Sequence, residues 1–506
     1  MLQNAEKMDQ PVKTQAEYTA LLHTVLGARY GDAPRAFVHT YGCQGNVADG
    51  ERIKGMLAEM GYLFTDTVES ADLVLYNTCA VREHAEDRVF GNVGALKNRK
   101  AARPGMVVAL CGCMMQQPRV AEKIRRSYPF VDLVFGTHVI HRLPELLYRT
   151  LCGRNRVFEL PDEAGSITEG LPVVRDSSFK AFLPVMYGCN NFCSYCIVPY
   201  VRGRERSRMV EAVLEEARSL VEAGYRDITL LGQNVNSYGK DLETPVPFAQ
   251  LLREINAIPG DFRIRFMTSH PKDCTRELLD AMADCEKVAK HLHLPFQSGN
   301  DRVLKEMNRR YTREQYLELI RYARQVMPEL SLTSDVIVGF PGETYEAFQD
   351  TLSLVEEVGF TSLFTFIFSP REGTPAAKMP DPVSREEKGR WFRELTDLQE
   401  RVASARNQKL LGKRFRVLVE GAGQKSRPSG RAHRGQPRDR ISRRRFTDWR
   451  VCGGCGNRGA RVDITRPNGN MTKSYFHCEN RLQAERLHSA SLRACRTAYG
   501  INFRVL

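Results

Sequence analysis

The sequence predicts an α/β protein with two successive domains built on parallel strands. Between residues 35 and 152, short apolar runs alternate with amphipathic helices, a pattern that favours a parallel sheet flanked by helices. The alternation resumes between residues 175 and 406, where about six strand–helix units predict an open partial (βα)6 barrel. With 506 residues, of which 42% are hydrophobic, the chain is long enough for about three domains with ordinary cores.

The N-terminal domain is expected to place three cysteines along one edge of its sheet. We expect strands at 36–40, 71–77, 106–110 and 131–135, and helices at 47–60, 83–100, 118–127 and 143–151. Cys43, Cys79 and Cys113 follow the first three strands, and the carboxyl ends of parallel strands form the usual ligand-binding edge. Three thiolates there could hold an iron–sulfur cluster with one iron left open. Three unrelated buried thiols are the alternative, since unpaired cysteine is commonly buried.

Two other cysteines of this domain are not expected to be ligands. Cys111 competes with Cys113, but it lies inside a strand, where its side chain should face a layer of the sheet. Cys113, in the turn that begins at Gly112, is therefore preferred. Cys152 is expected to be exposed and incidental.

The central domain carries a cysteine triplet with a distinctive spacing. Cys189, Cys193 and Cys196 form a C-x3-C-x2-C pattern just beyond the first strand of the barrel. Three thiolates on one tight loop can hold three irons of a [4Fe–4S] cube and leave the fourth iron open to a substrate or cofactor. A zinc site or buried structural cysteines are the alternatives. Tetrahedral zinc favours C-x2-C pairs and a fourth nearby ligand, and no His or Cys follows within this loop.

Several strand ends of the barrel carry residues that could contact a ligand. The strands are expected at 182–186, 227–231, 263–268, 291–295, 332–338 and 362–368, and the helices at 211–224, 248–255, 276–282, 313–326 and 344–358. Gln233 follows the second strand, Gln297 the fourth and Gly339 the fifth, while Asp335 lies inside the fifth and could reach the barrel lumen. Each is a weak signal alone, because turns after strands are often polar and glycine-rich for local reasons.

Three histidines border the same strands. His270 precedes a helix, and His291 and His293 lie in the expected fourth strand. We interpret all three as packed polar residues rather than as ligands.

Six motifs resemble the methylthiotransferase family of radical S-adenosylmethionine (SAM) enzymes. The first three are Thr40–Asn46 (TYGCQGN), Asn77–Arg82 (NTCAVR) and Gly112–Gln116 (GCMMQ). The others are the run from Tyr187 to Arg208 that contains the triplet, Asp335–Thr344 (DVIVGFPGET) and Ser369–Ala377 (SPREGTPAA). The resemblance covers roughly residues 36–422.

The resemblance implies two [4Fe–4S] clusters and SAM as cofactors. The triplet Cys189, Cys193 and Cys196 would hold the cluster that cleaves SAM, and Cys43, Cys79 and Cys113 an auxiliary cluster that carries the sulfur to be transferred. One SAM methylates that sulfur, and a second supplies a 5′-deoxyadenosyl radical. The candidate SAM contacts are Tyr195, Gln233, Gln297, Asp335 and Gly339.

Within the family, Cys79–Arg88 (CAVREHAEDR) and the following Gly91–Gly94 are most similar to the tRNA branch. That branch converts N6-dimethylallyladenosine next to the anticodon (position 37) into its 2-methylthio derivative. Carbon 2 of adenine is an unactivated aromatic C–H, so a cofactor must carry the hard step, and we nominate no side-chain general base. The alternatives are the same chemistry on threonylcarbamoyladenosine in tRNA or on an aspartate of a ribosomal protein, or a non-enzymatic Fe–S RNA-binding protein.

The excess positive charge is confined to the C-terminal part of the chain. The chain has 74 Lys+Arg and 60 Asp+Glu, and residues 424–506 contain 19 and 5 of them, which leaves residues 1–423 balanced at 55 of each. A basic terminal segment fits contacts with nucleic-acid phosphates. Residues 414–420 are expected to form a strand, which in this family opens a small all-β RNA-binding module, the TRAM domain.

The arginine-rich stretch 427–461 breaks the pattern of that module. It is either a divergent RNA-binding tail or a damaged or out-of-frame stretch, and its low apolar content with high net charge favours disorder. Cys452, Cys455, His477 and Cys478 would by themselves suggest zinc, but their surroundings do not support a folded site.

The expected fold class is therefore α/β: an N-terminal parallel-sheet domain, a central radical SAM partial (βα)6 barrel and a small, incomplete C-terminal all-β (TRAM-like) module. The expected domain limits are an N-terminal extension at 1–34, the auxiliary-cluster domain at 35–152, a linker at 153–174, the radical SAM domain at 175–406, the TRAM-like module at 407–470 and a disordered tail at 471–506.

The expected partners are tRNA, an electron donor such as flavodoxin or ferredoxin, and sulfur and cluster assembly proteins, acting on a monomer. The N-terminus lacks an apolar signal segment, and no apolar run approaches the roughly 20 residues that span a bilayer. We therefore expect a cytoplasmic protein without a membrane partner. Its 14 cysteines, in a long chain of this kind, argue against a disulfide scaffold.

Overall fold

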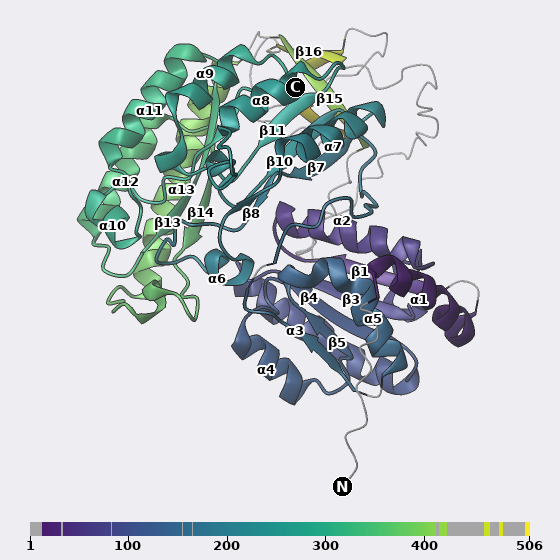
Figure 1. The fold of residues 1–506 in the computed structure, drawn as a ribbon. Coiled ribbons are helices and arrows are strands. Elements are labelled where there is room, and N and C mark those ends of the chain that lie inside the picture. The colour runs from purple at the N-terminus through teal and green to yellow at the C-terminus, as the bar shows by residue number, and fades with distance from the viewer. Residues whose placement is uncertain are drawn as a thin grey trace, which may run out of the picture. The chain divides into compact units, whose positions relative to one another are not determined.

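The computed structural model describes residues 13–31, 34–81, 83–153, 155–163, 165–410, 414–422, 460–465, 475–478 and 501–505. The chain forms two compact units, one from residues 1–353 and 364–392 and the other from residues 354–363 and 393–506. The elements run from α1 (Gln15–Tyr30) to β18 (Ile501–Val505), and Figure 1 shows their arrangement with many of them labelled.

The first part of the larger unit is a six-stranded parallel sheet with the order β2-β1-β3-β4-β5-β6. Its strands are β1 (Arg35–Thr40), β2 (Leu63–Phe64), β3 (Leu73–Thr78), β4 (Val107–Gly112), β5 (Leu133–Phe135) and β6 (Val157–Glu159). β2 lies on one side of β1 and β3 lies on the other, so the side on which successive strands are added changes at β1. Such a switch point opens a crevice at the carboxyl ends of the strands.

Helices cover both faces of this sheet. The core on one face includes residues of α1, α2 (Gln44–Glu59) and α5 (Leu143–Cys152). The other face packs against α3 (Glu83–Ala102) and α4 (Pro118–Ser127). Along β3, Leu73 and Leu75 belong to the first core and Val74 and Tyr76 to the second. This two-residue period, with every residue of β3 and β4 buried, is that of a sheet covered on both sides.

One helix of this domain was not expected from the sequence. Residues 15–30 form α1, whose Leu22 and Leu26 are fully buried in the first core. The Thr14 side chain accepts the Glu17 backbone N–H, and the Glu17 carboxylate accepts the Thr14 backbone N–H, which is a capping box. The capping box was the signal in the sequence, because the helix has little apolar periodicity.

The second part of the larger unit confirms the expected partial barrel. Parallel pairs join β7 (Lys180–Pro184), β10 (Asp227–Leu231) and β11 (Arg263–Phe266). A second sheet has the order β12 (His291–His293), β13 (Ser331–Val338) and β14 (Ser362–Ile367). A single parallel bridge between Ile264 and Val288 links β11 to the segment just before β12.

The helices of the barrel follow its strands. They are α7 (Val210–Glu222), α8 (Phe248–Ala257), α9 (Arg276–Asp284), α10 (Asp301–Glu306), α11 (Arg313–Val326), α12 (Tyr345–Val358) and α13 (Arg385–Gln408). The short α6 (Val198–Arg202) and the two-stranded β8 (Met186–Tyr187) and β9 (Arg206–Ser207) flank the cysteine triplet. Short 3-10 turns lie at η1 (Val68–Ser70), η2 (Thr137–Arg142), η3 (Val235–Ser237), η4 (Pro271–Asp273) and η5 (Pro375–Lys378).

The smaller unit contains a four-stranded antiparallel sheet with the order β17-β16-β15-β18. Its strands are β15 (Arg414–Ala422), β16 (Ala460–Thr465), β17 (Tyr475–Cys478) and β18. β15 confirms the strand expected at 414–420. Two of the strands fall within 471–506, for which no regular structure was expected. Most of the arginine-rich stretch 427–461, together with Cys452 and Cys455, lies outside the described residues, so the incomplete TRAM-like module stays a prediction.

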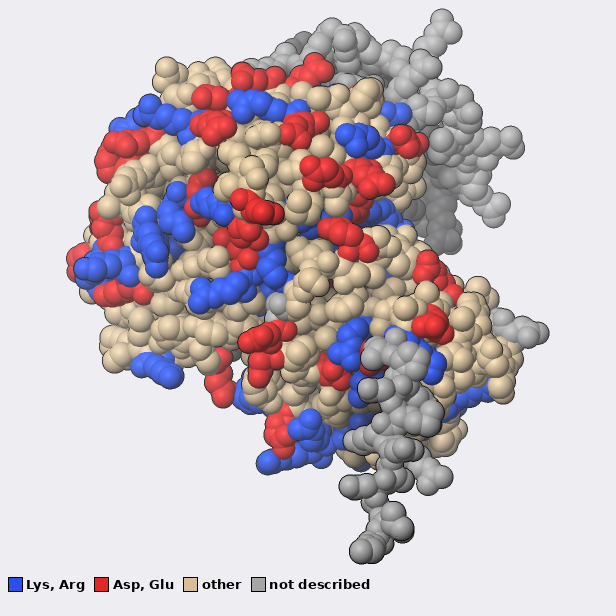
Figure 2. All heavy atoms as spheres, in the orientation of Figure 1, with Lys and Arg blue, Asp and Glu red and all other residues tan. Residues whose placement is uncertain are grey.

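The visible face of the described residues carries Lys and Arg side chains interspersed with Asp and Glu (Figure 2). This distribution agrees with the balanced charge of residues 1–423. Within the part of the chain that the structure describes, no helix has the length and apolar character needed to cross a bilayer.

Candidate functional site

The first group of cysteines gathers at the switch point of the N-terminal sheet. Cys43 lies between β1 and α2, Cys79 directly follows β3 and Cys113 directly follows β4. Cys79 and Cys113 are buried and Cys43 is exposed. The side chain of Asn46 lies between two of them, with its Oδ1 3.7 Å from Cys43 Sγ and 3.6 Å from Cys113 Sγ. The parallel strands therefore bring the three thiols to one edge.

Asn46 also fastens the loops that carry these cysteines. Its Nδ2 donates to the carbonyl of Tyr41, at 3.0 Å, and to that of Thr78, at 2.8 Å. In return, Asn77 Nδ2 donates to the Asn46 carbonyl at 2.8 Å. Asn46 could not be selected from the sequence beyond its place in a motif, because its role depends on residues from another strand.

Cys111 and Cys113 are both buried, but they pack against different residues. Cys111 packs in the first core, within the sheet, as expected. Cys113 instead contacts Ala80, Ile197 and Val201 outside that core. Burial raises the pKa of Cys113 to about 12, so its thiol is neutral until a metal displaces the proton. Cys152 is exposed, as expected.

The second group of cysteines lies on the loop after β8. The loop starts at Gly188, which has φ of +76°, and a Cβ there would lie 1.9 Å from the carbonyl oxygen of Arg204. Its backbone is closed by hydrogen bonds from Cys189 N to Gly203 O, at 3.1 Å, and from Cys196 N to Cys193 O, at 2.9 Å. Burial raises the pKa of Cys189 to about 11 and that of Cys196 to about 12.

Residues 307–309, directly after α10, contact this loop from the other side. Ser194 N donates to Met307 O at 3.0 Å. Asn308 Nδ2 donates to Phe192 O at 2.9 Å. The guanidinium of Arg309, which is 7% exposed, lies with Nη1 3.5 Å from Cys193 Sγ and donates through Nη2 to Pro295 O at 2.6 Å. Arg309 was not identified from the sequence, since it lies more than a hundred residues from the triplet.

The five candidate SAM contacts are distributed around the end of the barrel nearest the triplet. Tyr195 packs against the apolar cluster of Val303, Met307, Phe340, Ala347 and Ala376. Gln233 accepts the backbone N–H of Gly188, so its side chain supports the triplet loop. Gly339 has φ of +70° and its N–H donates to Glu343 Oε2 at 2.6 Å.

The other two candidates are neighbours: Gln297 follows β12, and its backbone N–H donates to the carbonyl of Asp335, in β13, at 3.0 Å. Gln297 pairs with Val336 by a single parallel bridge and has φ of +67°, an unusual conformation for a residue other than glycine. Asp335 is half-buried, and its Oδ1 lies 3.5 Å from His293 Nε2. His291 and His293 both hydrogen bond to the Thr333 hydroxyl, at 2.9 and 3.0 Å, which agrees with their interpretation as packed polar residues.

A set of buried polar atoms at the same end of the barrel has no hydrogen-bond partner among the described residues. They are Asn234 Oδ1, both amide atoms of Asn236, Ser269 Oγ, His270 Nε2 and Gln297 Oε1. Buried polar groups are normally satisfied, so a group of orphans points to a missing polar ligand or water. Asn236 and Ser269 were not expected from the sequence.

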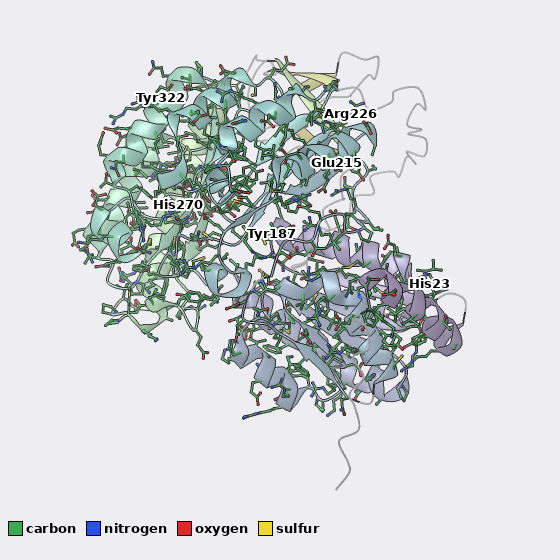
Figure 3. The ribbon with its side chains drawn as sticks, in the orientation of Figure 1. His23, Tyr187, Glu215, Arg226, His270 and Tyr322 are labelled. Atoms are coloured by element: carbon green, nitrogen blue, oxygen red, sulfur yellow. The ribbon has the colours of Figure 1, made fainter. Side chains whose placement is uncertain are left out.

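His270 departs partly from its interpretation as a packed residue. Its Nδ1 accepts the Lys272 N–H at 3.2 Å and its ring packs edge-on against Tyr311. Its Nε2, in contrast, belongs to the unpartnered set. Burial lowers the pKa of His270, and Arg309 lowers it further, so the ring is neutral. Figure 3 labels His270 among the barrel elements.

The donor chemistry of the two cysteine groups fits iron–sulfur clusters. Among the described residues, no three His, Cys, Asp or Glu side chains are arranged to bind a single metal ion. The thiolates that hold a cube each bind a different iron, so they need not converge on one point. Two sets of three soft thiolates, each at the carboxyl edge of a parallel sheet, are suited to that use.

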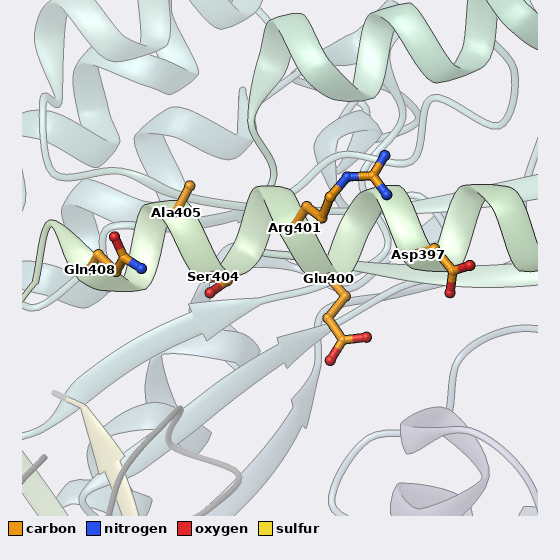
Figure 4. A pocket seen from close by; sticks show the side chains of 6 residues that line it. All are labelled: Asp397, Glu400, Arg401, Ser404, Ala405 and Gln408. Atoms are coloured by element: carbon orange, nitrogen blue, oxygen red, sulfur yellow. The ribbon is translucent and has the colours of Figure 1, made fainter. Parts of the chain in front are cut away.

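A separate hollow lies along α13. Its described lining side chains all come from that helix, between Asp397 and Gln408 (Figure 4). They include no cysteine, histidine or aromatic residue. We assign no chemistry to this hollow.

Comparison with known proteins identifies the superfamily to which this chain belongs. Residues 183–355 match the family model described as the Radical SAM superfamily, and residues 35–136 match the one described as Uncharacterized protein family UPF0004. A solved radical SAM methyltransferase, TsrM from Kitasatospora setae, shares the fold with a TM-score of 0.50 at 16% identity, over 68% of this chain and 75% of that one. The barrel with its triplet therefore defines a radical SAM protein.

Curated relatives identify the family of this chain within the radical SAM superfamily. The chain is 54% identical over 384 residues to a protein of Acetivibrio thermocellus named tRNA-2-methylthio-N6-dimethylallyladenosine synthase, covering 76% of this chain and 80% of that one. It is 49% identical over 411 residues to one of the same name from Caldicellulosiruptor saccharolyticus, covering 81% and 87%. The chain belongs to the family of tRNA-2-methylthio-N6-dimethylallyladenosine synthases.

Proposed function

We propose that the protein transfers a methylthio group to carbon 2 of N6-dimethylallyladenosine next to the tRNA anticodon (position 37). It would use SAM and two [4Fe–4S] clusters. The observation that carries the proposal is the pair of cysteine groups, each of three thiols at the carboxyl edge of its own parallel sheet, in a chain that is 54% identical to a relative of that name.

Each group of cysteines is assigned to one of the two clusters. Cys189, Cys193 and Cys196 would hold the cluster that binds SAM, and Cys43, Cys79 and Cys113 the auxiliary cluster. When bound, the two clusters and SAM supply the radical and the sulfur. The residues of the chain bind and orient these groups.

The barrel supplies the polar contacts for the bound molecules. The unpartnered amide of Asn236, the hydroxyl of Ser269 and the Nε2 of His270 would donate to or accept from SAM or the target base. Tyr195, Gln233, Gln297, Asp335 and Gly339 complete the proposed SAM site. Because the pKa of His270 is lowered, its ring orients ligands as a neutral group and does not add charge.

The proposal includes the partners and the setting of the reaction. We propose that the enzyme acts as a cytoplasmic monomer on tRNA. An electron donor such as flavodoxin or ferredoxin would reduce its clusters, and sulfur and cluster assembly proteins would maintain them. The domain limits given above, including the TRAM-like module at 407–470, belong to the same proposal.

Iron counting tests the ligand assignment. Anaerobically reconstituted full-length protein should contain about eight irons, since each cube holds four. The triple variants C189A/C193A/C196A and C43A/C79A/C113A should each retain about four. C111A is the matched control, because Cys111 packs in the sheet core beside Cys113 and should leave the iron content at about eight. Full iron in the C43A/C79A/C113A variant would refute the auxiliary assignment.

Product analysis tests the substrate. Each preparation is incubated with SAM, dithionite and tRNA that carries dimethylallyladenosine, and the digested nucleosides are analysed by mass spectrometry. We expect a methylthio product from the wild type and C111A, and from neither triple variant. SAM cleavage without product on this tRNA would move the substrate to threonylcarbamoyladenosine tRNA or a ribosomal protein, each assayed in parallel.

A further inference from the structure

Arg202 connects the cysteine triplet to the other cysteine group. It is the last residue of α6, which begins two residues after Cys196. Its guanidinium does not face the triplet. Nε donates to Cys113 Sγ at 3.1 Å, and Nη2 donates to Asp49 Oδ2 at 2.7 Å and to Asn46 Oδ1 at 2.9 Å. A residue of the barrel domain therefore completes the surroundings of a thiol in the N-terminal domain.

Packing fixes α6 in this position. Ile197 and Val201, at either end of the helix, pack with Ala80 and Cys113 in one small apolar cluster. The Thr137 hydroxyl donates to the Val201 carbonyl at 2.8 Å. The helix is thus held against the loops after β3 and β4 by apolar contact and by a hydrogen bond.

The electrostatics of Arg202 also point to a bound anionic group. The side chain of Arg202 is 8% exposed and forms an ion pair with Asp49, which is 6% exposed. Burying such a charge is costly unless it is fully paired. An arginine guanidinium stays protonated in proteins, so Arg202 carries its charge into this buried site. If Cys43, Cys79 and Cys113 hold a cluster, their three thiolates would add negative charge beside the Nε of Arg202.

We propose that Arg202 is a positioning residue that ties the auxiliary cluster to the loop of the SAM-cleaving cluster. Its Nε–H donates to the ligand sulfur of Cys113, and α6 fixes the separation of the two clusters. This inference rests on the proposed assignment of Cys43, Cys79 and Cys113 as ligands. Hydrogen bonds and positive charge at a ligand sulfur favour the reduced, more negative cluster. Arg202 should therefore raise the reduction potential of the auxiliary cluster.

The test isolates the auxiliary cluster. In the C189A/C193A/C196A background, we compare R202K, R202M and R202M/D49N by iron content, by the EPR spectrum of the reduced cluster and by its midpoint potential. R202M should lower the potential, change the EPR signal and reduce cluster affinity by about 10-fold. R202K keeps the positive charge but lacks the planar guanidinium with its several N–H donors, so it should lower the potential less than R202M does. R202M/D49N removes both charges and tests whether the effect comes only from leaving Asp49 unpaired.

Arg309 offers the matched control, since it lies near Cys193 as Arg202 lies near Cys113. In the full chain, R202K should lower the yield of methylthio product per 5′-deoxyadenosine by about 10-fold. R309K should lower the yields of methylthio product and of 5′-deoxyadenosine together, because Arg309 lies beside the cysteine triplet. R126K, on the exposed end of α4, serves as the surface control.

The outcomes separate this inference from the function on which it rests. Loss of four irons in C43A/C79A/C113A, with unchanged potential and EPR spectrum in R202K and R202M, would overturn only the role of Arg202. A wild-type EPR spectrum and wild-type cluster affinity in R202M/D49N would also overturn it, since the effects of R202M would then come from the unpaired carboxylate. If C43A/C79A/C113A keeps all its iron, the ligand assignment fails and the inference fails with it.

Discussion

The amide oxygen of Asn46 lies 3.6 Å from the sulfur of Cys113, although 67 residues separate them in the chain. The two residues follow different strands of one parallel sheet, on either side of its switch point. Asn46 is completely buried and ties the loop after β1 to that after β3. Hydrogen bonds, as well as apolar packing, therefore support the edge of the sheet that carries Cys43, Cys79 and Cys113.

Removing the Asn46 amide should damage both stability and cluster binding. In N46A, the carbonyls of Tyr41 and Thr78 lose their donor, which should lower the free energy of unfolding by about 2 to 4 kcal/mol. The auxiliary irons should be lost in the same variant. Denaturant unfolding and iron analysis check both effects, with N98A on the exposed face of α3 as the control. Wild-type stability and iron content in N46A would contradict this role.

Gly112 should not tolerate a side chain. It has φ of +97°, and a Cβ there would lie 2.4 Å from the carbonyl oxygen of Thr78. G112A should therefore lower the free energy of unfolding by about 3 kcal/mol and displace Cys113. G94A is the matched control, because nothing lies within 4 Å of its Cβ position in α3, and alanine there should stabilise by up to about 1 kcal/mol. Equal unfolding midpoints for the two variants would refute the prediction.

Glu343 should make stability depend on pH. The carboxyl is 1% exposed and accepts the N–H groups of Gly339 and Phe340, and burial raises its pKa to about 7 despite these bonds. The folded state keeps a proton that the unfolded chain releases near pH 4.5. The stabilisation is complete below that pH and is lost as pH rises through about 7, a decrease of about 3 kcal/mol.

Chemical unfolding between these pH values checks the sign of this effect. E343Q should flatten the dependence, since the amide oxygen can still accept both N–H groups but does not titrate. E318Q, exposed on α11, is the control and should keep the wild-type slope. An E343Q profile that is as steep as that of the wild type would rule out Glu343 as the titrating group.

Two aromatic side chains on β14 should contact the target nucleoside. Phe364 and Phe366 are 45% and 47% exposed, and alternate positions on a strand share a face. The Phe364 ring lies 5.7 Å from that of His293, which is close to Asp335. Because a base stacked on an aromatic ring gains about 1–3 kcal/mol, F364A should raise KM for the modified tRNA by about 10-fold.

The control for this prediction is F64A, which truncates another exposed phenylalanine, on β2 of the N-terminal sheet. F364A should weaken tRNA use while SAM cleavage without tRNA continues. A rise in KM for SAM, with KM for tRNA unchanged, would assign Phe364 to the cofactor instead.

Much of the fold could be predicted from residue patterns alone. The alternation around β3 and β4 encodes a parallel sheet, because strands buried on both faces read as short apolar runs. The helix α1 was missed, since its 16 residues bury only Leu22 and Leu26. The position of Cys79 and Cys113 after strands was sufficient to predict that they share an edge, as topology rather than detailed packing decides it.

The sequence by itself determined the positions of most strands along the chain and the two groups of three cysteines, because strand period and loop spacing are local properties of the chain. It could not predict that Arg202 reaches Asp49, 153 residues away, or that Arg309 reaches Cys193. Only the tertiary structure decided these contacts and the unpartnered atoms of Asn236 and Ser269. The contact of Arg202 depends on the packing of α6 against loops of the N-terminal domain, and the others depend on loops that follow different strands of the barrel. No periodic pattern along the chain records either arrangement.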